Sequence, residues 1–272
     1  MSDLISLNQD GSTHTPDARA PRRVRHPEAR RRALVVAGTE KISAHMKRVT
    51  LTGDLEGFKS LGFDDHVKIF LPHENLTATD EMPNLIGRDF TPRRLDPAAN
   101  TLDIDFAIHD AGPASRWAAQ AQPGQTLTLG GPRGSFIIPT SYDWHLLIGD
   151  ETGLPAIGRR LAELPPGVRT VVMIEIGTSS DEIALPTQAN ATVVWAHRND
   201  ADPGRTDVLA KTLAKLTLPK GDYYGWVACE SVIAKELRQQ LVAKHGANPK
   251  WVRASGYWRR GEAAIHEMHD GE

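Results

Sequence analysis

The chain of 272 residues has a single cysteine, Cys229, so it cannot form an intramolecular disulfide bond. It also lacks a cysteine and histidine cluster of the kind that cages a metal ion, and we predict no metal site. No apolar run is long enough to cross a membrane, and the N-terminus lacks the basic-then-apolar order of a secretory signal. A net charge of -2 offers no excess of positive charge to a nucleic acid. These absences favour a cytoplasmic protein that binds neither membranes nor nucleic acids.

The rest of the composition is typical of a globular protein, with 40% hydrophobic and 24% charged residues. The length suits one large domain or two ordinary ones.

Residues 1–20 are polar and aperiodic, which predicts a disordered leader. Arg19 to Arg32 then contains seven arginines. Such a run can bind nucleic acid, but prolines and Glu28 interrupt this one, and we interpret it as a solvated face.

Short alternating segments separated by turn signals continue to residue 139. They predict strands at 33–37, 46–52, 67–71, 88–94, 101–108, 125–129 and 136–138. A long polar loop is expected at 72–87, and one short helix at about 113–122. Strands at this near-regular spacing predict a small antiparallel β-barrel over residues 21–139.

After Pro139 the pattern changes to apolar strands that alternate with helices. Strands are predicted at 144–148, 169–176, 192–196, 224–229 and 251–258, with helices ending near 164 and at 206–216 and 231–245. This order is typical of a parallel α/β domain, here residues 140–260, followed by a tail at 261–272. Ligands of such a sheet bind at the carboxyl ends of its strands, although the chain has no GxGxxG motif.

Two segments of the first domain could bind a phosphate group. Residues 105–117 run from a strand through Gly112 and Pro113 into a helix, where unpaired N–H groups and the Ser115 hydroxyl can meet an anion. Residues 88–93 place two arginines beside Phe90, whose ring offers a flat face to another ring system. On local pattern alone, residues 105–117 are better explained as an ordinary strand–helix junction. Residues 88–93 are better explained as an exposed basic strand with one buried aromatic residue.

The ordered set of motifs nevertheless resembles the siderophore-interacting protein family, which comprises flavin-dependent ferric-siderophore reductases of ferredoxin-reductase-like fold. The segments that carry the resemblance are 62–68 (GFDDHVK), 88–91 (RDFT), 109–118 (HDAGPASRWA), 131–135 (GPRGS), 149–152 (GDET) and 253–258 (RASGYW). They span the chain from about residue 30 to 260. The resemblance implies a Greek-key β-barrel that binds FAD, followed by an α/β domain that binds NAD(P)H.

The family pattern also implies site residues. Those expected at FAD are Arg88, Asp89, Phe90, Thr91, Asp105, His109, Gly112, Ala114, Ser115 and Trp117. The pyrophosphate would lie over the helix start, with Ser115 and the amides after Gly112 as donors. The family usually has tyrosine at the position of Phe90, so stacking is kept and a hydroxyl hydrogen bond is lost.

Lys68 and Arg253 match basic positions that the family presents near the flavin, and we expect them to bind an anionic ferric siderophore, of catecholate type. The alternatives are a surface lysine paired with Asp65 and an arginine on an edge strand. Electron transfer needs no side-chain acid or base, so no catalytic pair is predicted from His109 and Asp110.

The resemblance implies a nicotinamide as electron donor. Thr152 and Glu230, at the ends of two predicted strands, are candidates near the nicotinamide. Arg198, with Ser179 or Ser180, is the candidate for the 2′-phosphate of NADPH, and NADH is not excluded.

Two other functions fit the same residues. One is a siderophore-binding carrier without reductase activity, with Phe90 as the sign of a decayed flavin site. The other is a flavin or ferredoxin oxidoreductase with a different acceptor. No long basic extension follows Arg260, which favours a nicotinamide over ferredoxin as the donor. No extended apolar stripe is visible either, and we expect a monomer.

Overall fold

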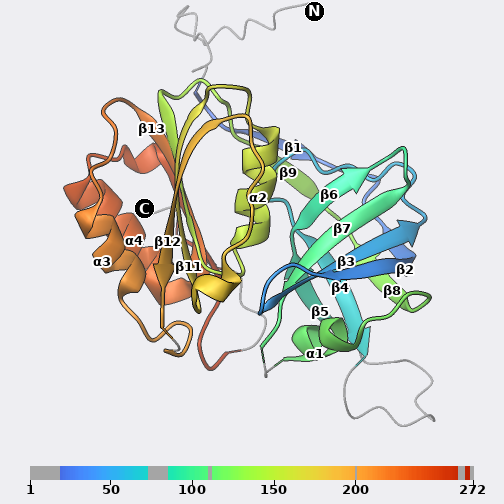
Figure 1. Ribbon diagram of the computed structural model, residues 1–272. Coiled ribbons are helices and arrows are strands. Elements are labelled where there is room, and N and C mark those ends of the chain that lie inside the picture. Colours follow the sequence, from blue (N-terminus) through green and yellow to red (C-terminus); the bar gives the residue numbers. More distant parts are fainter. Residues whose placement is uncertain (1–18, 73–84, 110–111, 200, 263–266, 270–272) are drawn as a thin grey trace, which may run out of the picture.

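The computed structural model describes residues 19–72, 85–109, 112–199, 201–262 and 267–269 (Figure 1). Two bodies lie side by side: a curled β-sheet with one helix at its end, and a flat sheet with helices on both faces. Residues 1–18 of the predicted leader and most of the predicted 72–87 loop fall outside the described residues. Within the described ranges, no helix is long and apolar enough to cross a bilayer.

The first body confirms the predicted antiparallel barrel, in the form of a curled sheet of seven strands in the order β5-β4-β8-β2-β3-β7-β6. A separate ribbon pairs β1 with β9. The strands are β1 (Arg22–Arg25), β2 (Arg31–Lys41), β3 (Met46–Gly53), β4 (Val67–Pro72), β5 (Leu85–Phe90), β6 (Pro92–Asp96), β7 (Thr101–Ala107), β8 (Thr126–Gly130) and β9 (Gly134–Ile137). Buried and exposed residues alternate along β2, as expected where one face of a sheet packs on a core.

Two details of this sheet differ from the prediction. The single extended run at 88–94 is two strands, because β5 pairs with β4 whereas β6 pairs with β7, and the chain changes partner at Thr91. The arginine-rich strand β1 was interpreted only as part of a solvated face. It forms because its backbone pairs with β9, from Arg22 opposite Ile137 to Arg25 opposite Gly134.

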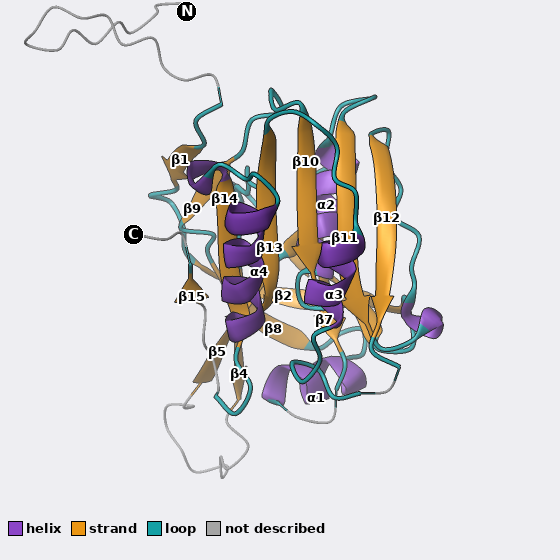
Figure 2. Cartoon of the chain, turned by 90° about the vertical axis from the view of Figure 1, so that its left-hand side faces the viewer, coloured by secondary structure: helices purple, strands orange, loops and turns teal. Residues whose placement is uncertain are grey.

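The second body confirms the predicted parallel α/β domain. Strands β10 (Trp144–Gly149), β11 (Arg169–Ile176), β12 (Asn190–His197), β13 (Tyr223–Glu230) and β14 (Val252–Trp258) are parallel, in the order β12-β11-β10-β13-β14. Helix α2 (Leu154–Glu163) covers one face, and α3 (Val208–Lys215) and α4 (Ser231–Lys244) cover the other (Figure 2). Every residue of β10 and β13 is buried, which explains their continuous apolar runs.

The segment expected to be a C-terminal tail contributes to this sheet. Strand β15 (Glu267–Met268) pairs antiparallel with β14, and it is too short for a period-two pattern to reveal. Two short 3₁₀ helices, η1 (Ser179–Asp181) and η2 (Pro249–Trp251), complete the elements of this body.

The strand order reverses between β10 and β13, so the loops that follow these two strands diverge and leave a crevice at the carboxyl edge of the sheet. Two glycines let the loop after β10 pack closely there. A Cβ atom at Gly153 would lie 2.5 Å from the carbonyl oxygen of Ala228 on β13, and one at Gly149 would lie 3.0 Å from it. The closer of the two, Gly153, is a position at which any side chain would clash with the backbone of β13.

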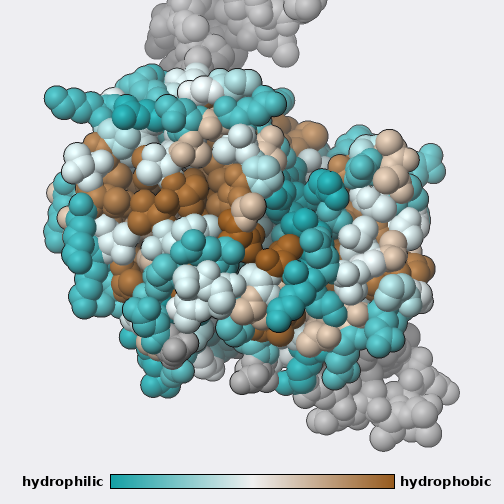
Figure 3. Space-filling model, viewed as in Figure 1, coloured by the Kyte–Doolittle hydropathy of each residue, from teal (hydrophilic) through white to brown (hydrophobic). Residues whose placement is uncertain are grey.

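Polar contacts join the two bodies, and hydrophilic side chains line much of the junction on the face seen in Figure 3. Arg159 of α2 is buried, and its Nη1 atom donates to the Ser60 hydroxyl (2.7 Å) and the Pro92 carbonyl (2.9 Å) of the first body. Its Nη2 atom donates to the Ser60 carbonyl at 2.9 Å. Helix α2, which begins near the carboxyl edge of the parallel sheet, is thereby held against the curled sheet.

Candidate functional site

Three aromatic rings form a row on the first body, close to helix α1 (Pro113–Gln120). The ring centroids of Phe90 and Phe106 are 4.5 Å apart, and those of Phe106 and Trp117 are 5.7 Å apart. Phe106 is fully buried, whereas Phe90 and Trp117 are only partly buried. The row therefore presents two partly exposed aromatic faces on a rigid base.

Arg88 and Phe90 lie on the same face of β5, since they alternate with Asp89. Arg88 is half-buried, and its Nη1 atom donates to the Gly87 carbonyl at 2.9 Å. No carboxylate in the described part of the chain pairs with it. Thr91, directly after β5, is buried.

The start of α1 has the open form expected of an anion cradle. Its N-cap residue is Gly112, which has φ 104° and no side chain, and Pro113 follows at the first helical position. No side chain caps the free amides of the first turn. The Ser115 hydroxyl, however, already has two hydrogen-bond partners: it accepts from the His109 amide (2.8 Å) and donates to the His109 carbonyl (2.6 Å). Ser115 therefore fixes the backbone of His109 against the first turn of α1.

Two residues expected at FAD lie apart from this face. Asp89 points to the opposite face of β5 from Arg88 and Phe90, and its carboxylate pairs with Lys68 at 2.8 Å. Asp105 is buried on β7, where Arg48 binds it through Nε (2.7 Å) and Nη2 (2.8 Å). Its carboxylate is therefore already neutralised by an arginine.

The remaining residues fit a flavin dinucleotide. A partly exposed aromatic pair suits a ring system, the uncapped amides after Gly112 suit a pyrophosphate, and the half-buried Arg88 offers a cation that no described carboxylate neutralises. His109 is exposed and Ala114 is half-buried beside this cradle. The residues that could hold FAD are thus Arg88, Phe90, Thr91, Ala114 and Trp117, with His109 and Gly112 beside them.

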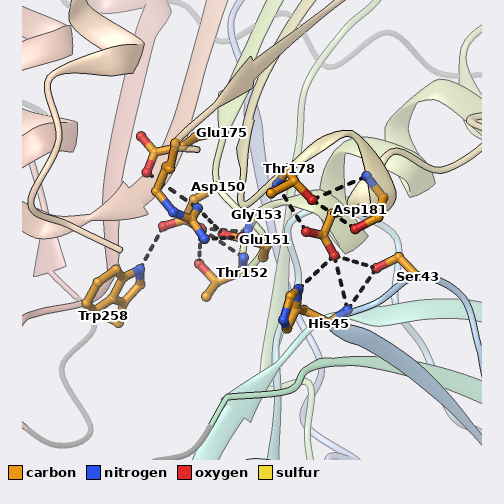
Figure 4. Close-up of polar contacts among 12 residues, drawn as sticks. Ser43, His45, Asp150, Glu151, Thr152, Gly153, Glu175, Thr178, Asp181 and Trp258 are labelled. Atoms are coloured by element: carbon orange, nitrogen blue, oxygen red, sulfur yellow. Dashed lines mark hydrogen bonds and ion pairs between the residues drawn. The ribbon is translucent and has the colours of Figure 1, made fainter. Parts of the chain in front are cut away.

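A second group of polar residues lies at the carboxyl edge of the parallel sheet (Figure 4). Its centre is Asp150, which is 5% exposed. One carboxylate oxygen accepts from the Thr152 amide (2.8 Å) and hydroxyl (2.6 Å), and the other accepts from the Trp258 indole (2.7 Å). Burial, and then the neighbouring Glu151, raise the pKa of Asp150 above its ordinary value.

Arg198 lies in the same group. Its Nη2 and Nη1 atoms bind Glu151 at 2.6 and 2.9 Å, and Nη1 lies 3.5 Å from Glu175. Burial, and then Asp150, raise the pKa of Glu175 to about 7. The structure thus brings Thr152 and Arg198 together, and it also ties the Arg198 guanidinium to two carboxylates.

Glu230 lies at the end of the adjacent strand, β13, and acts as the N-cap of α4. One of its carboxylate oxygens accepts from the amides of Val232 (2.7 Å) and Ile233 (3.2 Å), and the other accepts from the Arg260 amide (3.3 Å). This carboxylate is 4% exposed and is engaged by backbone donors.

The two cations expected to bind substrate are both paired. Lys68 pairs with Asp89, not with Asp65. The Nε atom of Arg253 donates to Asp64 at 3.0 Å, and its guanidinium lies 4.4 Å from the centre of the Phe136 ring. Burial raises the pKa of Asp64, which also accepts from the Trp226 indole at 3.3 Å. The Arg253 contact crosses from β14 to the first body, so this cation lies at the junction.

Another contact across the junction involves η1. Asp181 is 1% exposed, and its Oδ1 atom accepts from the His45 amide at 3.1 Å and lies 2.9 Å from the His45 ring nitrogen (Figure 4). Burial opposes ionisation of Asp181, but its hydrogen bonds with His45 and the Thr178 amide outweigh that effect and lower its pKa. Asp181 therefore joins η1 to the curled sheet.

Sequence reasoning missed four members of the strand-end group: Asp150, Glu151, Glu175 and Trp258. The first two stand in the GDET segment, where only Thr152 was singled out. Glu175 had a visible signal, because it is a lone charge inside the apolar strand 169–176. Trp258 stands in the RASGYW segment that carries the resemblance, but its place beside Asp150 depends on the order of the strands and could not be predicted.

Comparison with known proteins agrees with this arrangement. Residues 35–136 match the model of the siderophore-interacting FAD-binding domain, and residues 142–261 match that of the siderophore-interacting protein. The chain is 39% identical over 258 residues to an NADPH-dependent ferric-chelate reductase of Escherichia coli (strain K12), covering 88% of this chain and 97% of that protein. It is 31% identical over 246 residues to a ferric vibriobactin reductase of Vibrio cholerae, covering 83% and 89%.

A solved structure is also similar. It is a siderophore utilization protein from T. fusca, with a TM-score of 0.83 and 36% identity, covering 92% of this chain and 99% of that one. Most of both sheets, the cradle beside α1 and the strand-end group fall within the residues that match the two family models. The chain therefore belongs to the siderophore-interacting protein family.

Proposed function

We propose that this protein is an FAD-containing, NADPH-dependent ferric-siderophore reductase. The observation that carries the proposal is the neighbourhood of two sites: an aromatic and arginine face with an open helix start on one body, and the carboxyl edge of a parallel sheet on the other. The chain matches 97% of the length of an Escherichia coli protein that is named an NADPH-dependent ferric-chelate reductase, which supports this proposal. We assign residues 21–139 to FAD and residues 140–260 to the nicotinamide, because pairing changes from antiparallel to parallel between β9 and β10.

The reaction couples a donor of electron pairs to an acceptor of single electrons. A nicotinamide gives up a hydride, which carries two electrons, whereas Fe(III) takes one. FAD, when bound, supplies chemistry that accepts a pair and returns electrons singly. One NADPH then reduces two ferric chelates to ferrous chelates and releases one proton. The oxygen ligands of a siderophore hold Fe(II) more weakly than Fe(III), so reduction releases the iron.

The protein residues bind and orient the reactants. Phe90 and Trp117 offer faces to the flavin ring, and the amides after Gly112 offer donors to its pyrophosphate. Asp150 is held by Thr152 and Trp258, so it fixes the loop at the strand switch, where a nicotinamide would enter. None of these roles requires a side chain to transfer a proton.

Lys68 and Arg253 remain our candidates for binding an anionic chelate of catecholate type. Asp64 engages only the Nε atom of Arg253 among the described contacts, so the two Nη atoms can still donate to a ligand. The Lys68 ammonium group pairs with one oxygen of Asp89, and the Lys68 side chain is 45% exposed, so its other N–H groups can reach a ligand. An ion pair at each cation holds it in one orientation before the chelate arrives.

Arg198 is our candidate for the 2′-phosphate of NADPH. Its guanidinium would have to exchange a contact with Glu151 or Glu175 for the phosphate. A phosphate carries more charge than a carboxylate and binds a guanidinium more strongly, and the exchange requires that the displaced carboxylate turn away or take up a proton, as the raised pKa of Glu175 allows. We further propose a monomeric, cytoplasmic enzyme that takes electrons from a nicotinamide and not from ferredoxin.

The test is anaerobic mixing of FAD-loaded protein with NADPH, followed by a ferric catecholate, with the flavin absorbance recorded throughout. We expect the absorbance to fall on addition of NADPH and to recover on addition of the ferric chelate. A protein that takes up no FAD but binds the chelate would instead be a carrier. Bleaching by NADPH with recovery only on ferredoxin or free flavin would show a different acceptor.

A further inference from the structure

The arginines at the start of the described chain fall into two classes. Arg19 pairs with Asp143 (3.2 Å) and Asp222 (2.6 Å), and Arg30 pairs with Asp54. Of the arginines between them, Arg22, Arg23 and Arg25 are all exposed, and none has an ion pair with any described carboxylate. In a chain with a net charge of -2, three exposed cations in one four-residue strand are a local excess of positive charge.

The pairing of β1 with β9 decides which way these arginines point. Residues directly opposite each other in an antiparallel pair share a face, so Arg23 lies on the face of Phe136, and Arg25 lies on the same face opposite Gly134. Arg22 belongs to the other face, with Val24 and Ser135. The strand thus carries two arginines on one side and one on the other.

The inner face of the ribbon is anchored. His26, directly after β1, lies with its Nε2 atom 2.8 Å from the Ser135 hydroxyl, which donates to Asp65 at 2.5 Å. The same hydroxyl accepts from the Leu61 amide at 3.0 Å. The ribbon is therefore fixed to the loop that contains Asp64 and leads to Lys68, and its outer face has a defined position.

That outer face adjoins the two cations assigned to the substrate. Two guanidinium groups lie near the Phe136 ring. That of Arg23 is 5.5 Å from the ring centre, and that of Arg253 is 4.4 Å from it. On the other side, Lys68 stands opposite Gly130 and Arg25 stands opposite Gly134, and only residues 131–133 separate those two glycines. Arg23 therefore lies beside Arg253, and Arg25 follows it on the same face of β1, opposite the end of the connection that begins at the partner of Lys68.

We propose that Arg23 and Arg25 form an outer rim of the substrate site that selects ferric chelates carrying net negative charge. A tris-catecholate complex of Fe(III) carries three net negative charges, whereas a trishydroxamate complex can be neutral. Exposed cations attract the former from a distance and leave the latter unaffected, and salt screens their effect. This inference rests on the proposed reductase function for its substrate, but binding can be measured without any reduction.

The test uses gallium(III) tris-catecholate, a complex of the same charge that is not reduced, and records quenching of tryptophan fluorescence in the FAD-loaded protein. We expect the double variant R23Q/R25Q to raise the Kd roughly five-fold at low salt, as expected for two exposed charges. Arg22→Gln is the control: it removes one charge from the same strand on the opposite face, and it should raise the Kd by clearly less than half as much as the double variant does. Addition of salt should shrink the difference between the parent and the double variant.

Three results would overturn the proposal: an equal Kd in the parent and the double variant, at least half of the loss in the Arg22→Gln control, or an equal loss for a neutral gallium(III) trishydroxamate. An absence of binding to the parent would overturn it as well. Reduction of the ferric chelates with NADPH is measured on the same samples. The parent could bind the gallium complex with the expected dependence on Arg23 and Arg25 and yet reduce no ferric chelate. That result would reject the proposed reductase function and support the proposed role of Arg23 and Arg25 in binding.

Discussion

The Glu175 carboxyl should make the folded protein less stable as the pH rises. Its side chain is 3% exposed, and its pKa is raised to about 7, first by burial and then by Asp150. Its Oε2 atom has no hydrogen-bond partner among the described residues. Because one pKa unit corresponds to about 1.36 kcal/mol, raising the pKa from 4.5 to about 7 makes the ionised form cost the folded state about 3 kcal/mol.

The sign follows from the protons bound in each state. Below pH 4.5 the carboxyl is protonated both folded and unfolded, and the cost is absent. Between pH 4.5 and about 7 the folded state keeps a proton that the unfolded state has released, so the free energy of unfolding falls as the pH rises. Above about 7 the whole cost is present. Glu175→Gln keeps the shape and removes the charge, so it should stabilise the protein by up to about 3 kcal/mol near pH 8 and by about 1 kcal/mol or less near pH 5.

The assay is urea unfolding at a series of pH values between these two, followed by circular dichroism. Glu236→Gln is the matched control, because it makes the same substitution at an exposed side chain on α4. An unchanged pH slope in Glu175→Gln would refute the reasoning. A loss of stability near pH 8 would refute it too, since it would mean that the contact with Arg198 outweighs the cost of burial.

Four further predictions follow from the site. Replacing both Lys68 and Arg253 with alanine should raise the KM for an anionic ferric chelate by roughly ten-fold or more while FAD stays bound, and an unchanged KM would remove both from the substrate site. Ser115→Ala should weaken FAD retention, measured by dialysis, before it changes the KM for NADPH, because its hydroxyl fixes the backbone of His109 against the first turn of α1; the reverse order would place a different ligand there. Arg198→Ala should slow oxidation of NADPH more than that of NADH, and equal losses would count against a phosphate contact. Gly153→Ala should lower the free energy of unfolding by roughly 1–3 kcal/mol, because its Cβ atom would lie 2.5 Å from a carbonyl oxygen of β13; an unchanged midpoint in urea would show that the loop can yield.

Most of the fold was predictable because its signals are local. The strand at 169–176 was predicted with its observed bounds, since a buried central strand is a continuous apolar run between turn residues. The change of partner at Thr91 was not predictable, because period-two alternation continues through a segment whichever strand it pairs with. Strand β1 was missed for a related reason: its four residues gain a place in the fold through backbone bonds to β9, and arginine side chains give no strand signal.

The site residues divide in the same way. The likeness of the RDFT segment drew attention to Arg88 and Phe90, and β5 does present both on one face. The ion pair between Arg198 and Glu151 joins the ends of β12 and β10, which are separated by β11, and it could be foreseen only from the strand order. Sequence spacing therefore indicated which residue types were present, while the sheet topology decided which of them were already paired.

The buried Arg159 contacts also bear on how the protein can turn over. Both Nη atoms of this α2 residue donate to the first body, Arg253 donates to Asp64, and Asp181 accepts from His45. Moving the two bodies apart would therefore break hydrogen bonds at three separate places. Each of these bonds would leave a buried polar group without a partner. We therefore expect the nicotinamide and the chelate to arrive and leave through separate openings at the edges of a closed junction. The spacing between the two binding faces would then be set by the folded chain itself, and the rate of turnover would depend on the exchange of the substrates and on the driving force.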